Sequence, residues 1–426
     1  MPQPSSRRSF LTKSVLAAAL APMTSITSFG QGLETAVENT HKTSAPADLK
    51  ITDIKCGYVR GSLFVKIYSN QDIWGCGEGV DAIPGTYHLV KNFSNRIKGK
   101  NPLNVHRLFE DIRRSGFFQG AQSGMYVAVL SAIETALWDL TGKALGLPVY
   151  QLLGGKFRDK IRVYCDTALY QRNLPTPKDF ADAALRSKNM GFNAIKFDLD
   201  QANDPHKYDQ YNWTASPLEL QRMVDQISAA REAVGPDIDI CADMHGRYDA
   251  VTAQQIAKRL EPLNLMWLEE PIPAENVEAY KLITDSTSTP ICAGENHYLA
   301  HGFRRMLEIG AVDIVMPDLQ KAGGLGEGQR IANLANLYYV PFAPHMVASF
   351  LGAMAAAHVC ASVPNFLILE WQSYFHTEPM FKEIIKYDGT WVENSFITLS
   401  EKPGIGVEIN EEGMKKYGIP GIPFFE

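Results

Sequence analysis

Three carboxylates occur at equal intervals in the second half of the chain. Asp243, Glu269 and Glu295 are 26 residues apart, and each comes at or just after the end of a short apolar run. Like charges that meet at one place repel each other unless a cation lies among them, and carboxylate oxygens without thiolate ligands favour Mg²⁺. The spacing therefore predicts a Mg²⁺ site formed by these three side chains.

The same rhythm continues toward the C-terminus. Asp318, His345 and Glu370 follow at intervals of 23, 27 and 25 residues, and each closes a further apolar run. Asp318 and His345 would be neighbours, and a carboxylate beside an imidazole fixes its tautomer and raises its basicity, as a general base requires. A second imidazole, His245, lies two residues beyond Asp243. We therefore expect two histidines on opposite sides of a metal, which suits acid–base catalysis.

Eight short apolar runs would have to position these residues. They alternate with amphipathic stretches and cover residues 163–168, 194–197, 238–242, 265–268, 291–293, 314–316, 340–343 and 366–369. Parallel strands covered on both sides read as unbroken apolar runs, and in a parallel barrel the active site lies at the carboxyl ends of the strands. An open doubly wound sheet is the alternative, but no GxGxxG fingerprint follows the first run. The pattern favours an α/β fold built on a modified TIM-type (β/α) barrel.

The chain outside the barrel follows other patterns. Residues 50–158 combine strand-like and helical segments and predict an α+β capping domain, with the barrel at 159–370. The tail at 371–426 lacks the strand–helix alternation, and we expect it to return to the cap. The glycine-rich stretch at 77–82 either closes over the barrel mouth or forms an ordinary surface turn. The long connection at 199–217 offers aromatic and polar groups to a ligand or forms a surface insertion.

The first 49 residues are interpreted as a targeting segment and a linker. Arg7 and Arg8 precede an apolar stretch at 15–21 that is too short to cross a bilayer. Residues 1–30 resemble a twin-arginine export signal, and residues 31–49 read as a polar linker. We therefore expect a periplasmic or otherwise exported protein that has no membrane segment in its mature form.

The composition excludes several classes of protein. The chain has 426 residues, 45% of them hydrophobic and 21% charged, which is typical of a soluble globular protein. Its 41 Lys and Arg against 47 Asp and Glu leave a net charge of −6, so it lacks the basic surface of a nucleic-acid binder. The six cysteines are scattered without CxxC pairs, and we interpret them as buried small hydrophobic residues.

The motifs around the predicted ligands resemble those of a known family. They are Trp267-Leu268-Glu269-Glu270-Pro271, Ala293-Gly294-Glu295, Pro317-Asp318 with Gly323-Gly324, and Pro344-His345. Together they resemble the enolase superfamily, in its mandelate racemase-like branch, over residues 50–426. The resemblance implies a capping domain over a modified barrel, Mg²⁺ held at Asp243, Glu269 and Glu295, a homo-oligomer, and abstraction of the proton α to a carboxylate.

Within that branch, Asp-x-His after the third strand together with a His–Asp pair resembles sugar-acid dehydratases of the galactonate dehydratase type. The second strand carries Lys196-Phe197-Asp198, where racemases of the branch carry Lys-x-Lys. The second lysine serves those enzymes as a base, so two-base racemisation with lysine is disfavoured here.

We therefore predict a Mg²⁺-dependent dehydratase of a small sugar acid. His345, oriented by Asp318, would remove the C2 proton, and protonated His245 would assist departure of the C3 hydroxyl. Glu370 would share a hydrogen bond with a developing enediolate oxygen. Further substrate contacts are expected from Lys196, Asp198, Arg247 and His297. For Lys196 an ion pair with the carboxylates is the alternative.

Two alternatives stay open. A cycloisomerase or epimerase of a sugar-acid lactone or anhydro-sugar acid would use the same enediolate with a different protonation step. A non-catalytic sugar-acid receptor would bind without turnover, although a complete set of Mg²⁺ ligands with two histidines argues against it.

Overall fold

The computed structural model describes residues 46–167, 169 and 173–426. The predicted export signal, and all of the predicted linker before Pro46, lie outside the described residues. Within the described ranges, every helix is too short or too polar to cross a membrane.

The N-terminal module is a three-stranded antiparallel sheet covered by helices. Its strands, in spatial order, are β1 (Ile51–Val59), β2 (Ser62–Ser69) and β3 (Trp74–Gly79). The helices are α3 (Tyr87–Ile97), α4 (Val105–Ser115) and the largely buried α5 (Gly124–Leu145). β3 approaches α5 so closely that a Cβ atom on Gly77 would lie 2.1 Å from the carbonyl oxygen of Ala132. Glycine is therefore required for this contact, because any side chain would collide with the helix backbone.

The second module is a barrel of parallel strands. The strands are β4 (Lys160–Asp166), β5 (Ala194–Asp198), β6 (Asp239–Asp243), β7 (Trp267–Glu269), β8 (Ile291–Ala293), β9 (Ile314–Val315) and β10 (Leu369–Gln372). Their order is β10-β4-β5-β6-β7-β8-β9, so the first and last strands of the barrel pair with each other. The predicted barrel is confirmed.

The seventh predicted strand forms only an isolated pairing. Phe342 makes parallel bridges to Val315 on one side and Phe366 on the other, which closes the ring between β9 and β10. Pro341 and Pro344 bracket this position, and proline lacks the N–H group that a regular ladder needs. The prediction of eight regular strands was therefore wrong at this place, although the position in the ring is filled.

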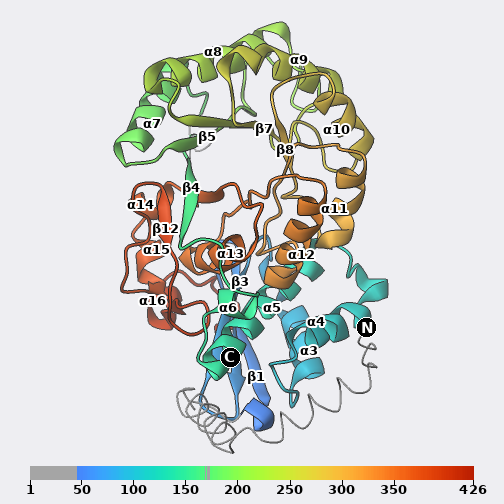
Figure 1. The fold of residues 1–426 in the computed structure, drawn as a ribbon, viewed down its shortest axis with the longest axis vertical. Coiled ribbons are helices and arrows are strands. Elements are labelled where there is room, and N and C mark those ends of the chain that lie inside the picture. Colours follow the sequence, from blue (N-terminus) through green and yellow to red (C-terminus); the bar gives the residue numbers. More distant parts are fainter. Residues whose placement is uncertain (1–45, 168, 170–172) are drawn as a thin grey trace, which may run out of the picture. The chain divides into compact units, whose positions relative to one another are not determined.

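Helices surround the barrel, as Figure 1 shows for α7, α8, α9 and α10 outside β5, β7 and β8. They are α7 (Pro177–Asn189), α8 (Pro217–Val234), α9 (Ala250–Leu260), α10 (Val277–Thr284), α11 (Leu299–Glu308), α12 (Gly324–Leu337) and α13 (Phe350–Ser362). Side-chain N-caps start several of them, for example Ser216 on α8 and Asp249 on α9. A separate buried cluster that includes Tyr164, Trp267 and Met316 packs between the strands. All six cysteines are free and buried, as predicted.

The C-terminal tail returns to the N-terminal module. β12 (Phe396–Thr398) pairs with β4, and β11 (Ile385–Lys386) pairs with β13 (Glu408–Ile409). Further on, Gly418 forms a bridge with Val59, and the Phe425 N–H donates to the carbonyl of Cys56 at 2.7 Å. The tail therefore completes the cap, as the sequence predicted. Short helices α6 (Val149–Leu152), α14 (Tyr374–Thr377), α15 (Met380–Glu383) and α16 (Glu411–Lys415) connect these parts.

Candidate active site

The strand register brings the predicted ligands to one end of the barrel. Asp198, Asp243 and Glu269 are paired across β5, β6 and β7, each as the last residue of its strand. Glu295 follows β8 after Gly294, whose φ of 148° suits glycine and whose added Cβ would lie 2.9 Å from the Met316 backbone. The three predicted metal ligands therefore lie at the carboxyl ends of neighbouring strands, where barrel active sites lie.

Lys196 lies among these carboxylates. Its Nζ is 2.8 Å from Glu370, 3.1 Å from Asp243 and 3.3 Å from Glu269, and the side chain is only 2% exposed. Burial lowers the pKa of Lys196, but the charges of Glu269 and Glu370 outweigh it and raise this pKa well above its ordinary value. Lys196 is therefore a buried ammonium group that balances part of the negative charge of these three carboxylates.

His345 is held between carboxylates. Its Nδ1 lies 2.8 Å from Asp318 Oδ2, and its Nε2 lies 2.7 Å from Glu295 Oε2 and 3.5 Å from Glu370 Oε2. Burial lowers the pKa of His345, but the charges of Glu370 and Glu295 raise it well above its ordinary value. Asp318 is fully buried, and a parallel backbone bridge places it directly beside His345, so it fixes the imidazole orientation.

His245 has a carboxylate partner of its own on the other side of the site. Its Nδ1 lies 2.8 Å from Asp200 Oδ1, and its Nε2 lies 3.5 Å from Asp243 Oδ2. Its backbone N–H donates to Asp243 Oδ1 at 2.8 Å, and its own φ of 45° turns the chain back at the strand end. Burial lowers the pKa of His245, but the Asp243 charge and the Asp200 hydrogen bond raise it to about 12.

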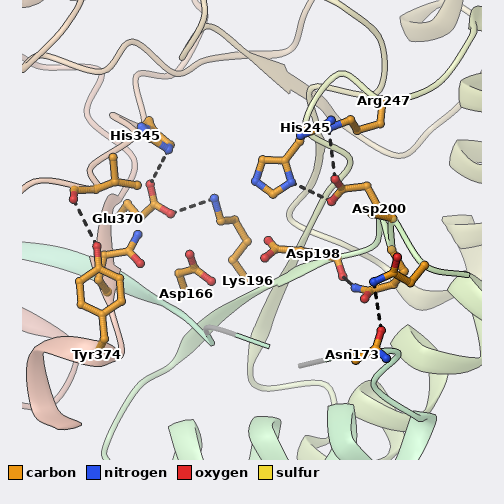
Figure 2. A pocket seen from close by; sticks show the side chains of 15 residues that line it. Asp166, Asn173, Lys196, Asp198, Asp200, His245, Arg247, His345, Glu370 and Tyr374 are labelled. Atoms are coloured by element: carbon orange, nitrogen blue, oxygen red, sulfur yellow. Dashed lines mark hydrogen bonds and ion pairs between the residues drawn. The ribbon is translucent and has the colours of Figure 1, made fainter. Parts of the chain in front are cut away.

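A cavity of about 590 Å³ opens between the two histidines. Figure 2 shows His345 and Glu370 on one side, His245 on the other, and Lys196 between them. The cavity is lined by Asp166, Asn173, Lys196, Asp198, Asp200, Gln201, Ala202, Asn203, His245, Arg247, His345, Val347, Glu370, Gln372 and Tyr374. The structure therefore brings both predicted acid–base residues, Glu370 and three of the four predicted substrate contacts to one space.

His297 is the exception, and its prediction as a substrate contact was wrong for this structure. The residue follows Glu295 closely, but its backbone N–H donates to Gly294 and its ring packs against Phe303 with centroids 5.6 Å apart. The turn thus directs His297 toward α11, and it does not line the cavity. Burial lowers the pKa of His297 to about 4. Arg247 lines the cavity only at its rim, where its side chain is 69% exposed.

Two loops match only part of what the sequence predicts. Glu78 in the expected lid is buried and accepts the Ser349 backbone N–H at 2.8 Å, while Asp81 pairs with Lys321 at 2.8 Å. These contacts attach the loop to the barrel, and none of its residues lines the cavity. In the connection after β5, Gln201 and its two successors line the cavity, whereas the exposed Tyr211 and the other aromatic side chains do not.

Sequence reasoning missed Asp166 and Asp200. Asp166 ends β4 and occupies the first barrel position of the same series that identified Asp243. Asp200 comes two residues after the end of β5. The prediction considered only the polar residue that closes each strand, so it did not include Asp200. Burial and the charge of Asp166 raise the pKa of Asp198 well above its ordinary value.

The donor set fits a hard divalent cation. Asp243, Glu269 and Glu295 provide carboxylate oxygens, the ligands that Mg²⁺ prefers. Burial and the charge of Asp243 raise the pKa of Glu269 well above its ordinary value, so a cation beside Glu269 would stabilise its ionised form. Among the described residues, however, the group whose donor atoms lie within 4.8 Å of one another is Asp198, Asp243 and His245, which shares only Asp243 with the predicted ligand set.

Comparison with known families assigns the class. Residues 34–154 match the mandelate racemase/muconate lactonizing enzyme N-terminal domain, and residues 179–413 match the enolase C-terminal domain-like family. The chain belongs to the enolase superfamily, in its mandelate racemase/muconate lactonizing enzyme branch. The predicted family is thereby confirmed.

The more particular relatives are dehydratases. The chain is 36% identical over 394 residues to the D-xylonate dehydratase of Haloferax volcanii, covering 92% of this chain and 94% of that one. It is 34% identical over 358 residues to the D-galactonate dehydratase of Variovorax paradoxus, with coverage of 82% and 89%. These relatives place the chain among enzymes of the hydro-lyase class.

Solved structures agree. A mandelate racemase/muconate lactonizing enzyme-like protein from Rubrobacter xylanophilus is 42% identical with a TM-score of 0.85, covering 90% of this chain and all of that one. The 3,6-anhydro-D-galactonate cycloisomerase of Zobellia galactanivorans is 29% identical with a TM-score of 0.77, and the match covers 87% of this chain and 99% of that one.

Proposed function

We propose that the protein is a Mg²⁺-dependent sugar-acid dehydratase, which removes the proton α to a carboxylate and eliminates the β-hydroxyl to give a 2-keto-3-deoxy acid. One observation carries the proposal: two histidines, each bonded through Nδ1 to a carboxylate, line one cavity from opposite sides. Elimination of water needs a base at one carbon and an acid at the next, and this geometry supplies both. The dehydratase relatives support the same reaction.

His345 acts as the base. Asp318 accepts a hydrogen bond from Nδ1, which assigns that nitrogen its proton and leaves Nε2 to take the proton from C2. In the structure, Glu295 and Glu370 stand beside Nε2 and favour the protonated imidazole. A divalent cation on Glu295 would compete for that carboxylate and so favour the neutral Nε2 that a base requires.

His245 acts as the acid. Asp200 and Asp243 favour its protonated form, so it holds the proton that the departing C3 hydroxyl must receive. The leaving group thus departs as water into a cavity open to solvent. An Asn in place of His245 would leave C2 proton removal intact and stop elimination.

The remaining residues bind and compensate charge. Asp243, Glu269 and Glu295 would hold Mg²⁺, which when bound supplies positive charge beside the substrate carboxylate and so lowers the cost of forming the enediolate. Glu370, fixed by the Met346 N–H at 2.8 Å, lies between Lys196 and His345, where it shares a hydrogen bond with a developing oxygen.

A cycloisomerase of an anhydro-sugar acid is the second candidate, because the structural relative from Zobellia galactanivorans bears that name. Both reactions start with proton removal next to a carboxylate. Their products differ, since dehydration yields a keto acid that reacts with semicarbazide.

We also propose that the chain is exported and forms a homo-oligomer. The Arg7-Arg8 leader supports export, and cell fractionation with and without an Arg7→Lys, Arg8→Lys leader tests it. Light scattering of the mature chain tests the oligomer.

A screen of sugar acids tests the catalytic proposal. Each acid is incubated with the enzyme and Mg²⁺, and keto-acid formation is scored with semicarbazide. At least one acid should give a product that has lost one water. If the whole library stays unchanged while the enzyme is folded and binds Mg²⁺, the proposed reaction is wrong.

A further inference from the structure

We propose that Asp198, Asp243 and His245 form a second cation site, which shares only Asp243 with the predicted Mg²⁺ site and takes a metal that accepts an imidazole ligand, such as Zn²⁺. Zn²⁺ at this site inhibits dehydration, because it occupies the His245 nitrogen that serves as the acid. The site itself goes beyond the proposed function, and only its effect on the reaction rests on that function.

The donor atoms of these three side chains converge at the ends of β5 and β6. One donor atom of each side chain lies within 4.8 Å of the other two, and His245 Nε2 is 3.5 Å from Asp243 Oδ2. Ligand atoms that lie about 2.0–2.2 Å from a tetrahedral Zn²⁺ are about 3.4 Å from one another. His245 and Asp243 already have this separation, and a side-chain movement of Asp198 completes the set.

His245 is oriented as metal-binding histidines are. Its Nδ1 lies 2.8 Å from Asp200 Oδ1, which leaves Nε2 as the ligand atom on the side of Asp243. Histidine ligands almost always donate their other ring N–H to a carboxylate, a carbonyl or water, which fixes the tautomer and the ring orientation. In the view of Figure 2, the His245 ring lies between Asp200, to which it is bonded, and Lys196, with Asp198 below it.

Asp198 provides an independent indication of a ligand. The residue is 3% exposed and lines the cavity, and its Oδ1 has no hydrogen-bond partner in the part of the chain that the structure describes. Buried polar atoms in proteins are nearly always bonded, so this carboxyl oxygen indicates a partner from outside the chain. A cation held with Asp243 and His245 supplies that partner.

The donor set favours Zn²⁺ over Mg²⁺. Two carboxylates and one imidazole suit Zn²⁺, whereas Mg²⁺ prefers oxygen ligands in nearly octahedral geometry. A zinc ion with three protein ligands keeps its fourth position for water or substrate, and the cavity of about 590 Å³ beside His245 gives the ion a path of entry. Asp243 has two carboxylate oxygens and is therefore able to bridge this ion and Mg²⁺.

Zinc at this site and acid catalysis by His245 exclude each other. As the bond between Zn²⁺ and Nε2 forms, the proton on Nε2 is released to solvent. The departing C3 hydroxyl then finds no proton at this position. His345 lines the cavity from the opposite side and is bonded to Asp318, so removal of the C2 proton continues.

Calorimetric titration of the enzyme with ZnCl₂ in saturating Mg²⁺ tests the site without reference to activity. We expect one equivalent of Zn²⁺ to bind to the wild type. Asp200→Asn removes the partner of Nδ1 but no ligand, so Zn²⁺ affinity should fall by about 10–100-fold, and His245→Asn and Asp198→Asn should cost at least as much. His301→Asn, at an exposed position of α11, is the matched control and should bind Zn²⁺ as the wild type does.

Circular dichroism and a parallel titration with MgCl₂ show whether each variant is folded. If folded His245→Asn or Asp198→Asn binds Zn²⁺ as tightly as the wild type, the proposed site is wrong.

A kinetic experiment in D₂O tests the effect on the reaction. With a substrate and Mg²⁺ present, saturating Zn²⁺ should lower keto-acid formation by about 100-fold or more while C2 exchange continues. If both signals fall together and excess Mg²⁺ restores them, Zn²⁺ replaces Mg²⁺ at its own site and the inference is overturned. If no acid is dehydrated even without Zn²⁺, the proposed function fails, whereas the calorimetric test of the site is unaffected.

Discussion

The His345–Asp318 pair provides the sharpest prediction of the catalytic account. Asp318→Asn keeps the shape and the acceptor oxygen next to Nδ1, which lies 2.8 Å from Oδ2, but it removes the buried negative charge. A charge pair at about 4 Å in an effective dielectric of about 20 gains about 4 kcal/mol. The imidazolium that forms when His345 takes the C2 proton would lose this stabilisation.

The size of the rate loss follows from how much of that charge has developed in the transition state. Half of about 4 kcal/mol corresponds to about a 30-fold loss of kcat and all of it to about a 1,000-fold loss. We therefore expect kcat of Asp318→Asn to fall between these limits, with KM changed much less because the residue does not line the cavity. The assay is keto-acid formation together with C2 hydrogen exchange measured by NMR, and both rates should fall in parallel.

The matched control is Asp313→Asn, at the opposite end of β9, where the carboxylate accepts the Ile291 N–H. This variant should keep wild-type kcat. Retention of more than about a tenth of kcat by Asp318→Asn, with unchanged C2 exchange, would refute the assigned role of the pair, since general-base contributions are typically about 10²–10⁴-fold.

Two further predictions concern stability. Lys196→Met leaves the carboxylates around it without their ammonium partner, so the free energy of unfolding measured in chelator should fall by about 3–5 kcal/mol. Part of this loss should be recovered when Mg²⁺ is added. The exposed Lys178→Met is the control, and equal urea midpoints for the two variants would contradict the role of Lys196. Burial raises the pKa of Glu134 from 4.5 to about 7 despite hydrogen bonds from the Gly326 N–H and the Trp138 indole. Between these two pKa values the folded chain holds a proton that the unfolded chain has lost, so stability is full below about pH 4.5 and falls by about 3 kcal/mol as the pH rises to about 7. Urea unfolding across this pH range should show the decline in wild type and a flatter profile in Glu134→Gln, and identical profiles would contradict it.

Much of the barrel could be predicted because its strands are covered on both sides and read as separate apolar runs. The spacing between Asp243, Glu269 and Glu295 could be used to predict that they lie at the same end of the barrel. One helix and one strand separate each from the next, and that unit has a nearly constant length. The run around Phe342 was a weaker case. Its apolar character is that of a buried strand, but Pro341 and Pro344 have no N–H groups with which to form a regular ladder. A hydrophobic pattern does not show that these hydrogen-bond donors are missing.

Side-chain direction could not be read from spacing alone. His297 and His245 both lie two residues beyond a predicted ligand, yet one turns toward α11 and the other toward the cavity, because different local turns follow β8 and β6. Lys196 was expected to contact carboxylates or substrate, but its contact with carboxylates from three strands at once depends on ring closure between β10 and β4. The partner of His245, Asp200, depends on a loop whose course has no simple sequence signal.

The most direct test of the central claim follows the C2 hydrogen and the C3 hydroxyl in one experiment. An aldonate accepted by the enzyme is incubated with Mg²⁺ in D₂O, and NMR records both C2 exchange and keto-acid formation for wild type, His345→Asn and His245→Asn. The account predicts that His345→Asn loses both signals, while His245→Asn keeps C2 exchange and forms no keto acid. Exchange that persists without His345, or elimination that persists without His245, would contradict it.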